Sequence, residues 1–437
     1  MSTTETHQAI NAVWRIEQAK LVAGLARMVR DIGQAEELAQ DALVVALERW
    51  PETGIPDNPG AWLMATAKRR AIDRLRHRKM QDRKHVEIGY GLDLEQESAV
   101  ADLEARLDDD IGDDLLKLVF TACHPILSRE ARVALTLRLI GGLSTAEIAR
   151  AFFVPEPTIA QRIVRAKRAL ADAEVPYEVP RGDELAARLA SVCEVVYLVF
   201  NEGYAATAGE DWIRPQLAQE AVRLGRILAG LAPGEAEVHG LVALMEIQSS
   251  RFAARVGPNG EPVLLLDQNR ARWDHLLIRR GLAALDRAEA LGPRGPYTLQ
   301  AAIAACHARA ATADQTDWLR IADLYDELAT LTPSPVVELN RAVAIAMAHG
   351  PAAGLAIVDA LANEPALAAS HLLPGVRADF LMKLDRLDEA RIEFERAASL
   401  TRNQRERDLL MARAAECAGG IGERPATASL ASARRPP

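Results

Sequence analysis

The sequence predicts an all-α protein, and three of its features support that prediction. Aromatic residues make up only 4% of the 437 residues, whereas alanine and leucine recur throughout, which favours closely packed helices over sheets. Apolar residues recur at three- and four-residue spacing. Proline and glycine clusters break these periodic segments. The chain is long enough for two or three domains, each with its own core.

Two helices are expected in a first domain, residues 1–85. Residues 31–50 have an apolar side and an acidic side, and Pro51 and Gly54 are expected to end this helix. Asn58 is a suitable cap and Pro59 suits the first turn of the next helix, residues 60–78. That helix is expected to bury an apolar face and to project most of its basic residues outward. The expected inward residues are Trp62, Leu63, Ala67, Ile72 and Leu75.

The formal net charge of −9 hides two basic segments on either side of an acidic one. Residues 68–84 hold nine basic residues and two acids, and residues 158–170 hold four basic residues and no acid. Residues 87–114 hold eleven acids and one arginine, so residues 86–112 are predicted to be an acidic linker. One basic run could be only a solvated helix face, but two basic helices joined by a linker favour a nucleic-acid partner.

The second predicted domain, residues 113–175, contains a helix-turn-helix pattern. Ser144 and Glu147 form a capping box at the start of one short helix, and Pro157 lies in the first turn of the next. A tight turn separates the two helices, and the second helix is basic. Its expected inward residues are Ile159, Ile163, Val164 and Leu170. Thr158, Gln161, Arg162, Arg165 and Lys167 are left free for contact.

The segments AEELAQDALVVALERWP and PGAWLMATAKRRAIDRLRHR resemble conserved region two of bacterial sigma factors of the extracytoplasmic-function (ECF) type. In that family the first helix docks on RNA polymerase, and the second approaches the −10 promoter element as it melts. The resemblance implies polymerase contacts at Asp31, Glu37, Gln40 and Asp41. It implies −10 contacts at Trp62, Lys68, Arg69, Arg70, Asp73, Arg74 and Arg76. The family often has asparagine at the position of Arg69, which favours a phosphate contact there.

The segment GLSTAEIARAFFVPEPTIAQRIVRAKRAL resembles sigma region four, which reads the −35 element. Major-groove geometry then favours Gln161, Arg162 and Arg165 as base readers, with Thr158 also free for contact. Lys167 and Arg168 are expected to contact phosphates. In the family the linker between the two regions passes through polymerase channels that otherwise hold nucleic acid. The acidic linker could mimic that polyanion, or it could serve only as a solubilising spacer.

Residues 181–416 are predicted to form a third, helical domain, with a disordered tail at 417–437. Small and large residues in the segment 374–402 fit a tetratricopeptide hairpin, although an irregular helical domain is an alternative. Segments such as LVFNEGYAA and DQNRARWDHLLI also resemble the extension of one ECF subgroup that carries a tetratricopeptide-like domain. Seven residues are candidates for a functional surface, although helix caps and buried polar contacts explain them equally well. These are Asn201, Glu202, Asp267, Gln268, Arg272, Trp273 and Asp274.

The sequence contains no glycine-rich phosphate loop, HExxH or GxSxG motif, so an enzyme, a metal centre or a cofactor site is not expected. The four cysteines are widely spaced and are expected to be buried free thiols. No signal peptide or membrane span is predicted, which favours a cytoplasmic protein. The sequence therefore predicts a sigma factor that directs core RNA polymerase to promoter DNA, with an extension that regulates or supports it through a protein or intramolecular partner. The alternatives are a helix-turn-helix repressor and a helical-repeat scaffold, neither of which recruits polymerase.

Overall fold

The all-α prediction is confirmed by the computed structural model. The structure describes residues 3–85, 111–152, 154–206, 208–210, 212–258 and 260–419. Within these residues, β-structure consists of one short parallel pair, Ala208–Gly209 with Arg402–Asn403, and an isolated bridge between Val256 and Pro262. Most of the predicted acidic linker and of the predicted tail lies outside the described residues.

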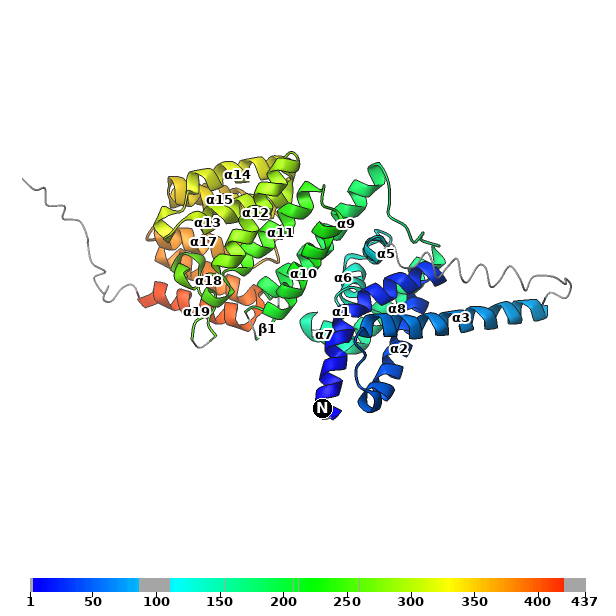
Figure 1. The fold of residues 1–437 in the computed structure, drawn as a ribbon. Coiled ribbons are helices and arrows are strands. Elements are labelled where there is room, and N and C mark those ends of the chain that lie inside the picture. Colours follow the sequence, from blue (N-terminus) through cyan, green and yellow to red (C-terminus); the bar gives the residue numbers. More distant parts are fainter. Residues whose placement is uncertain are drawn as a thin grey trace, which may run out of the picture. The chain divides into compact units, whose positions relative to one another are not determined.

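The chain divides into two compact units (Figure 1). The first unit comprises residues 1–205 and 214–245, and the second comprises 206–213 and 246–437. The first unit therefore holds both basic segments together with two helices of the predicted third domain.

The first unit is a helical assembly in which α1 packs against α2, α3 and α5, and α6 packs against both α8 and α9. Leu21, Leu25, Leu38 and Leu63 are almost fully buried in the core of α1, α2 and α3. The helices are α1 Thr3–Val29, α2 Ile32–Thr53, α3 Pro59–His85, α5 Ile111–Ala122, α6 Arg129–Leu139, α7 Thr145–Phe152, α8 Glu156–Asp172, α9 Asp183–Tyr204 and α10 Pro215–Leu231. Helix α11, Ala236–Ser249, begins in this unit and ends in the other.

Several predicted helix ends are confirmed, and two are wrong. The helix predicted at residues 60–78 runs from Pro59 to His85. The side chain of Asn58 accepts a hydrogen bond from the backbone N–H of Ala61 at 3.1 Å, as its role as a cap requires. Pro51 does not end α2, which continues to Thr53 before Gly54 caps it at a φ of 82°. Pro51 cannot donate to the carbonyl of residue 47 and its ring crowds that carbonyl, but only two residues of α2 follow it, so little of the helix depends on the lost bond.

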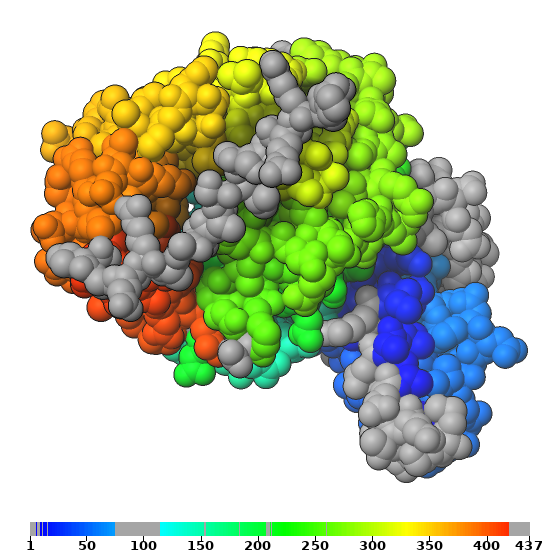
Figure 2. All heavy atoms as spheres, turned by 90° about the vertical axis from the view of Figure 1, so that its left-hand side faces the viewer, coloured from blue at the N-terminus to red at the C-terminus, as the bar shows by residue number. Residues whose placement is uncertain are grey.

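The second unit is built from successive helices that pack against their sequence neighbours. Its helices are α12 His275–Leu291, α13 Pro296–Arg309, α14 Trp318–Leu331, α15 Pro335–His349, α16 Pro351–Ala360, α17 Leu372–Lys383, α18 Leu387–Leu400 and α19 Gln404–Gly419. In Figure 2 the atoms of α14 to α18, yellow through orange, form one continuous packed surface. The predicted break at Gly350-Pro351 separates α15 from α16.

The predicted packing of α17 against α18 is confirmed. Ala378, Ala390, Phe394 and Ala397 are all fully buried in one apolar cluster, where small residues let the helices approach and Phe394 fills the space between them. The tetratricopeptide-like character of the whole extension stays a prediction.

Part of the predicted functional surface in the extension has structural roles. Asp274 caps α12, Gln268 donates a hydrogen bond to the carbonyl of Val263, and the Trp273 side chain is buried. The neighbouring Arg270 donates hydrogen bonds to the carbonyls of His307 and Ala310 at the end of α13, both at 2.6 Å. The segment 267–274 therefore fastens the loop before α12 to the end of α13.

Candidate nucleic-acid interface

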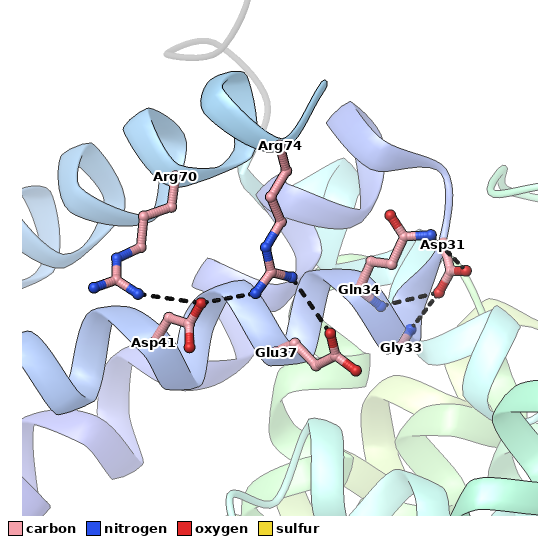
Figure 3. A network of polar contacts seen from close by, with 7 residues as sticks. All are labelled: Asp31, Gly33, Gln34, Glu37, Asp41, Arg70 and Arg74. Carbon is pink, nitrogen blue, oxygen red and sulfur yellow. Dashed lines mark hydrogen bonds and ion pairs between the residues drawn. The ribbon is translucent and has the colours of Figure 1, made fainter. Parts of the chain in front are cut away.

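The acidic face of α2 and the basic face of α3 are joined by ion pairs (Figure 3). One carboxylate oxygen of Asp41 lies 3.2 Å from Arg70 and 2.9 Å from Arg74. A carboxylate oxygen of Glu37 lies 3.3 Å from the same Arg74 guanidinium. All four side chains are at least one third exposed, so each ion pair is weak and exchangeable. Two residues expected to contact polymerase, Glu37 and Asp41, are therefore paired with two that are expected to contact DNA, Arg70 and Arg74.

Asp31 has a local structural role that sequence reasoning did not assign to it. Its side chain caps α2 by accepting hydrogen bonds from the backbone N–H groups of Gly33 at 2.7 Å and Gln34 at 3.0 Å. The second carboxylate oxygen accepts from the side chain of Gln34 at 3.1 Å, as Figure 3 shows. Because Asp31 is half-buried, this cap leaves part of its carboxylate accessible to a partner.

Glu36 is the residue of this region whose importance sequence reasoning missed. Its side chain is 2% exposed and accepts a hydrogen bond from Gln40 at 2.8 Å. It also pairs with Arg138 of α6 at 2.6 Å and with Lys167 of α8. Lys167, a predicted phosphate contact, is therefore engaged by a carboxylate from α2. The sequence placed Glu36 and Glu37 on the same acidic side and gave no reason to separate them.

The remaining predicted −10 residues lie along α3. The ring of Trp62 is half-buried and packs edge-on against Trp50 at 5.2 Å between centroids. Lys68 is half-buried, whereas Arg69 and Asp73 are exposed. Arg76 belongs to α3, but its side chain lies outside the described residues.

The helix-turn-helix consists of α7 and α8, and its predicted capping box is confirmed. The backbone N–H of Glu147 donates to the Ser144 hydroxyl at 3.2 Å, and the Glu147 carboxylate accepts from the N–H of Ser144 at 2.8 Å. Pro157 lies in the first turn of α8. The start of each helix is therefore fixed by its own sequence.

The exposed face of α8 carries most of the predicted −35 residues. Thr158, Gln161, Arg165 and Arg168 are all exposed. These residues follow one another at helical spacing and form one stripe. Arg168 lies 3.6 Å from Asp172 in a mostly exposed pair, which leaves its guanidinium available to a phosphate.

Arg162 differs from the rest of this set because it is half-buried. It lines a cavity of about 190 Å³ together with Arg129 and Glu130 of α6 and Glu202 of α9. Its charged neighbours in this cavity are two acids and one further arginine. Of the three predicted base readers, Gln161 and Arg165 are therefore the more accessible.

Val164 was predicted to point inward, and this prediction is wrong. Its side chain is 63% exposed, whereas Ile159, Ile163 and Leu170 are buried as expected. Val164 lies between Gln161 and Arg168 on the exposed stripe of α8. An apolar side chain among basic and polar ones can contact a thymine methyl group in the major groove.

Across the described residues, no three His, Cys, Asp or Glu side chains are grouped so that they could hold a metal ion. Cys123, Cys193 and Cys417 are buried and Cys306 is half-buried, all as free thiols. Burial raises the pKa of Cys123 to about 11 and that of Cys193 to about 12, so both remain protonated and are poor nucleophiles. No helix within the described part of the chain is long and apolar enough to span a membrane.

Comparison with known proteins identifies both segments of the chain that carry the predicted DNA-binding helices. Residues 15–80 match Sigma-70 region 2, and residues 117–170 match Sigma-70, region 4. The ECF RNA polymerase sigma factor SigK of Mycobacterium tuberculosis is 30% identical over 148 residues, which cover 33% of this chain and 74% of SigK. The chain belongs to the family of ECF RNA polymerase sigma factors. This sigma factor therefore carries region 2 on α1 to α3 and region 4 on α5 to α8.

The extension of this sigma factor is shared with a protein of unknown role. An uncharacterized protein of Rhizobium meliloti is 43% identical over 387 residues, which cover 88% of this chain and 90% of that protein. The probable ECF RNA polymerase sigma factor SigI of Mycobacterium tuberculosis is 29% identical over 173 residues, covering 40% of this chain and 58% of SigI. Residues 188–289 match a family of unknown function, DUF6596. These comparisons identify the family but assign no role to the extension.

Proposed function

We propose that this sigma factor binds core RNA polymerase in the cytoplasm, reads a −35 element with α8 and helps to melt a −10 element with α3. The observation that carries the proposal is the exposed stripe on α8, Thr158, Gln161, Arg165 and Arg168, which follows a capped helix and a tight turn. A helix of this kind fits the major groove of DNA, where such side chains reach bases and phosphates.

The proposed polymerase-binding residues are Glu37, Gln40 and Asp41 of α2 and Asp31, which caps this helix. Because Arg70 and Arg74 already pair with Asp41, binding of polymerase to this acidic face would release both guanidinium groups. The released cations could then hold the phosphates of the −10 element, with Trp62 and Arg69 nearby on the same helix. Each ion pair here is exposed enough for such an exchange.

We also propose that the extension regulates or supports promoter recognition as a tetratricopeptide-like domain. The fully buried small residues between α17 and α18 support this reading. Its partner would be another protein or another segment of this chain. The proposed division of the chain is region 2 at 1–85, a linker at 86–112, region 4 at 113–175 and the extension at 181–416.

Selection from a pool of random DNA duplexes tests the proposed function. The protein with core polymerase should enrich duplexes that carry two spaced elements, and neither component alone should do so. Equal enrichment by the protein alone would instead support a repressor. No enrichment under either condition would support a scaffold.

Replacing Asp41 with asparagine is expected to weaken association with core polymerase by about tenfold, as loss of a charged interface contact does. The free energy of unfolding should fall by less than about 1 kcal/mol, because the ion pairs of Asp41 are partly exposed. Titration of labelled core polymerase with each variant measures the first effect, and thermal unfolding measures the second. Glu48→Gln is the control, since Glu48 is also exposed on α2. Equal polymerase affinity of the two variants would remove Asp41 from the proposed interface.

A thymine methyl contact by Val164 can be tested by replacing each thymine of the selected −35 element with uracil. One of these changes should weaken binding of the wild-type holoenzyme by about fourfold, as expected for one apolar group. The Val164→Ala holoenzyme should lose this sensitivity, because its side chain no longer reaches the methyl group. The same replacement in the −10 element serves as the control. An unchanged response to uracil in Val164→Ala would exclude the contact.

A further inference from the structure

At the ends of three region 4 helices, backbone carbonyls accept hydrogen bonds from side chains outside region 4. The carbonyl groups in the last turn of a helix have no partner within the helix, so they need donors from elsewhere. In α5, α6 and α7 such donors come from α9 and from the segment 214–223, which leads into α10 and forms part of it. Gln18 of α1 adds one more, to the carbonyl of Arg138 in the last turn of α6. Helices α9 and α10 both begin beyond residue 170, where the region 4 match stops.

The end of α5 receives two donors from α9. Arg188 donates to the carbonyl of Phe120 at 3.0 Å, and its guanidinium is buried. The Ser191 hydroxyl donates to the carbonyl of Cys123 at 2.8 Å. A cation at a helix C-terminus is also favoured by the helix dipole.

The ends of α6 and α7 each receive a donor from α10 or from the residue that precedes it. Arg223 of α10 donates to the carbonyl of Ile140, the residue that caps α6, at 2.9 Å. Arg214, which precedes α10, donates to the carbonyl of Ala151 in the last turn of α7 and pairs with the buried Glu202 of α9. Arg214 therefore donates a hydrogen bond to the end of α7, directly before the turn of the helix-turn-helix.

Helix α9 is joined to α6 by ion pairs and packs closely against α10. Glu194 of α9 pairs with Arg129 at 2.5 Å and with Arg132 at 3.2 Å, both on α6. A side chain at Gly203 would meet the backbone of Ala218 at 2.3 Å, so α9 and α10 cross with no space between them. The two helices therefore form one closely packed pair that is joined to α6 by ion pairs.

We propose that α9 and α10 complete the −35-reading domain of this sigma factor. Helix α8 packs on α6 and α7, so its position depends on the two helices whose ends Arg223 and Arg214 hold. The first residues of the DUF6596 match, which spans 188–289, would therefore position the recognition helix. This proposal rests on the proposed function, because it assigns the −35 contact to α8.

The proposal is tested with two variants of the full-length protein, Arg223→Met and the double variant Arg188→Met/Arg223→Met. Arg181→Met is the matched control. Arg181 is an exposed residue just before α9. The first measurement is hydrogen exchange in the free protein, which does not depend on any activity. Amides in α5 to α8 should exchange about tenfold faster in the double variant, whereas those in α1 to α3 should not change. Arg223→Lys should restore part of the protection, because lysine retains a charged donor.

The second measurement compares holoenzyme binding to two DNA molecules, one with both promoter elements and one fork-junction DNA with only the −10 element. The double variant should lose about tenfold in affinity for the first and keep its affinity for the second. Unchanged exchange and unchanged −35 dependence would overturn the proposal. An equal loss of affinity for both DNA molecules would assign these contacts to overall folding and would also overturn it. A wild-type holoenzyme without any −35 dependence would refute the proposed function, and hydrogen exchange would still decide whether α9 and α10 support region 4.

Discussion

Replacing Glu36 with alanine is expected to lower the free energy of unfolding of the first unit by about 3 kcal/mol. Glu36 is 2% exposed and pairs with both Arg138 and Lys167, whose side chains are each 22% exposed. Removing the carboxylate leaves two cations partly buried with no acid between them, which costs more than losing an exposed pair. Gln40 also loses the acceptor for its side chain.

Glu37→Ala is the matched control for Glu36→Ala. The two residues are adjacent on α2, but the side chain of Glu37 is 67% exposed and pairs only with Arg74 among the described contacts. Its replacement should cost less than about 1 kcal/mol. Hydrogen exchange of the α1, α2 and α6 amides measures both variants, because it reports on the first unit alone. Similar losses in the two variants would contradict the role assigned to Glu36.

The second unit is expected to lose about 3 kcal/mol of stability as the pH falls from 6.5 to 4. Burial lowers the pKa of His307 to about 4, and the nearby Arg251 and Arg270 lower it further in the same direction. The pKa of a histidine in an unfolded chain is about 6.5. Folding therefore favours the neutral ring, so its stabilisation is complete above pH 6.5 and is lost as the pH falls towards 4.

His307→Gln should remove most of this acid sensitivity. Urea unfolding of both proteins at several pH values between 7 and 4 measures the difference, followed by hydrogen exchange in α13 and α14. His349→Gln is the control, because His349 is exposed on α15 of the same unit. The pKa of Asp379 is lowered as well, because Arg413 and Lys383 outweigh the opposing effect of its burial, so its contribution is lost only at lower pH. Equal pH dependence in wild type and His307→Gln would show that His307 does not cause the loss.

Local features of this fold could be predicted from the sequence. The capping box of Ser144 and Glu147, the cap at Asn58 and the turn at Gly350 each involve residues within four positions of one another. Such interactions form whatever else the helix contacts. The apolar positions of α17 and α18 were predictable for a similar reason, since their spacing defines one face of each helix.

Features that depend on distant packing could not be predicted. Glu36 and Glu37 are chemically identical neighbours, and only the approach of α6 and α8 makes one of them a buried ion pair. Val164 fits an apolar pattern, but the position of α8 leaves it exposed. The donors that hold the ends of α5, α6 and α7 come from residues about 60 to 80 positions away, and no local pattern announces them.

Transcription from genomic DNA fragments tests the central claim most directly. Bacterial core RNA polymerase and this protein are mixed with the fragments, and the 5′ ends of the transcripts are sequenced. We expect start sites that appear only when both proteins are present and that share two upstream elements at a fixed spacing. Identical start sites with core polymerase alone, or no new start sites with both proteins, would contradict a role for this chain in promoter recognition.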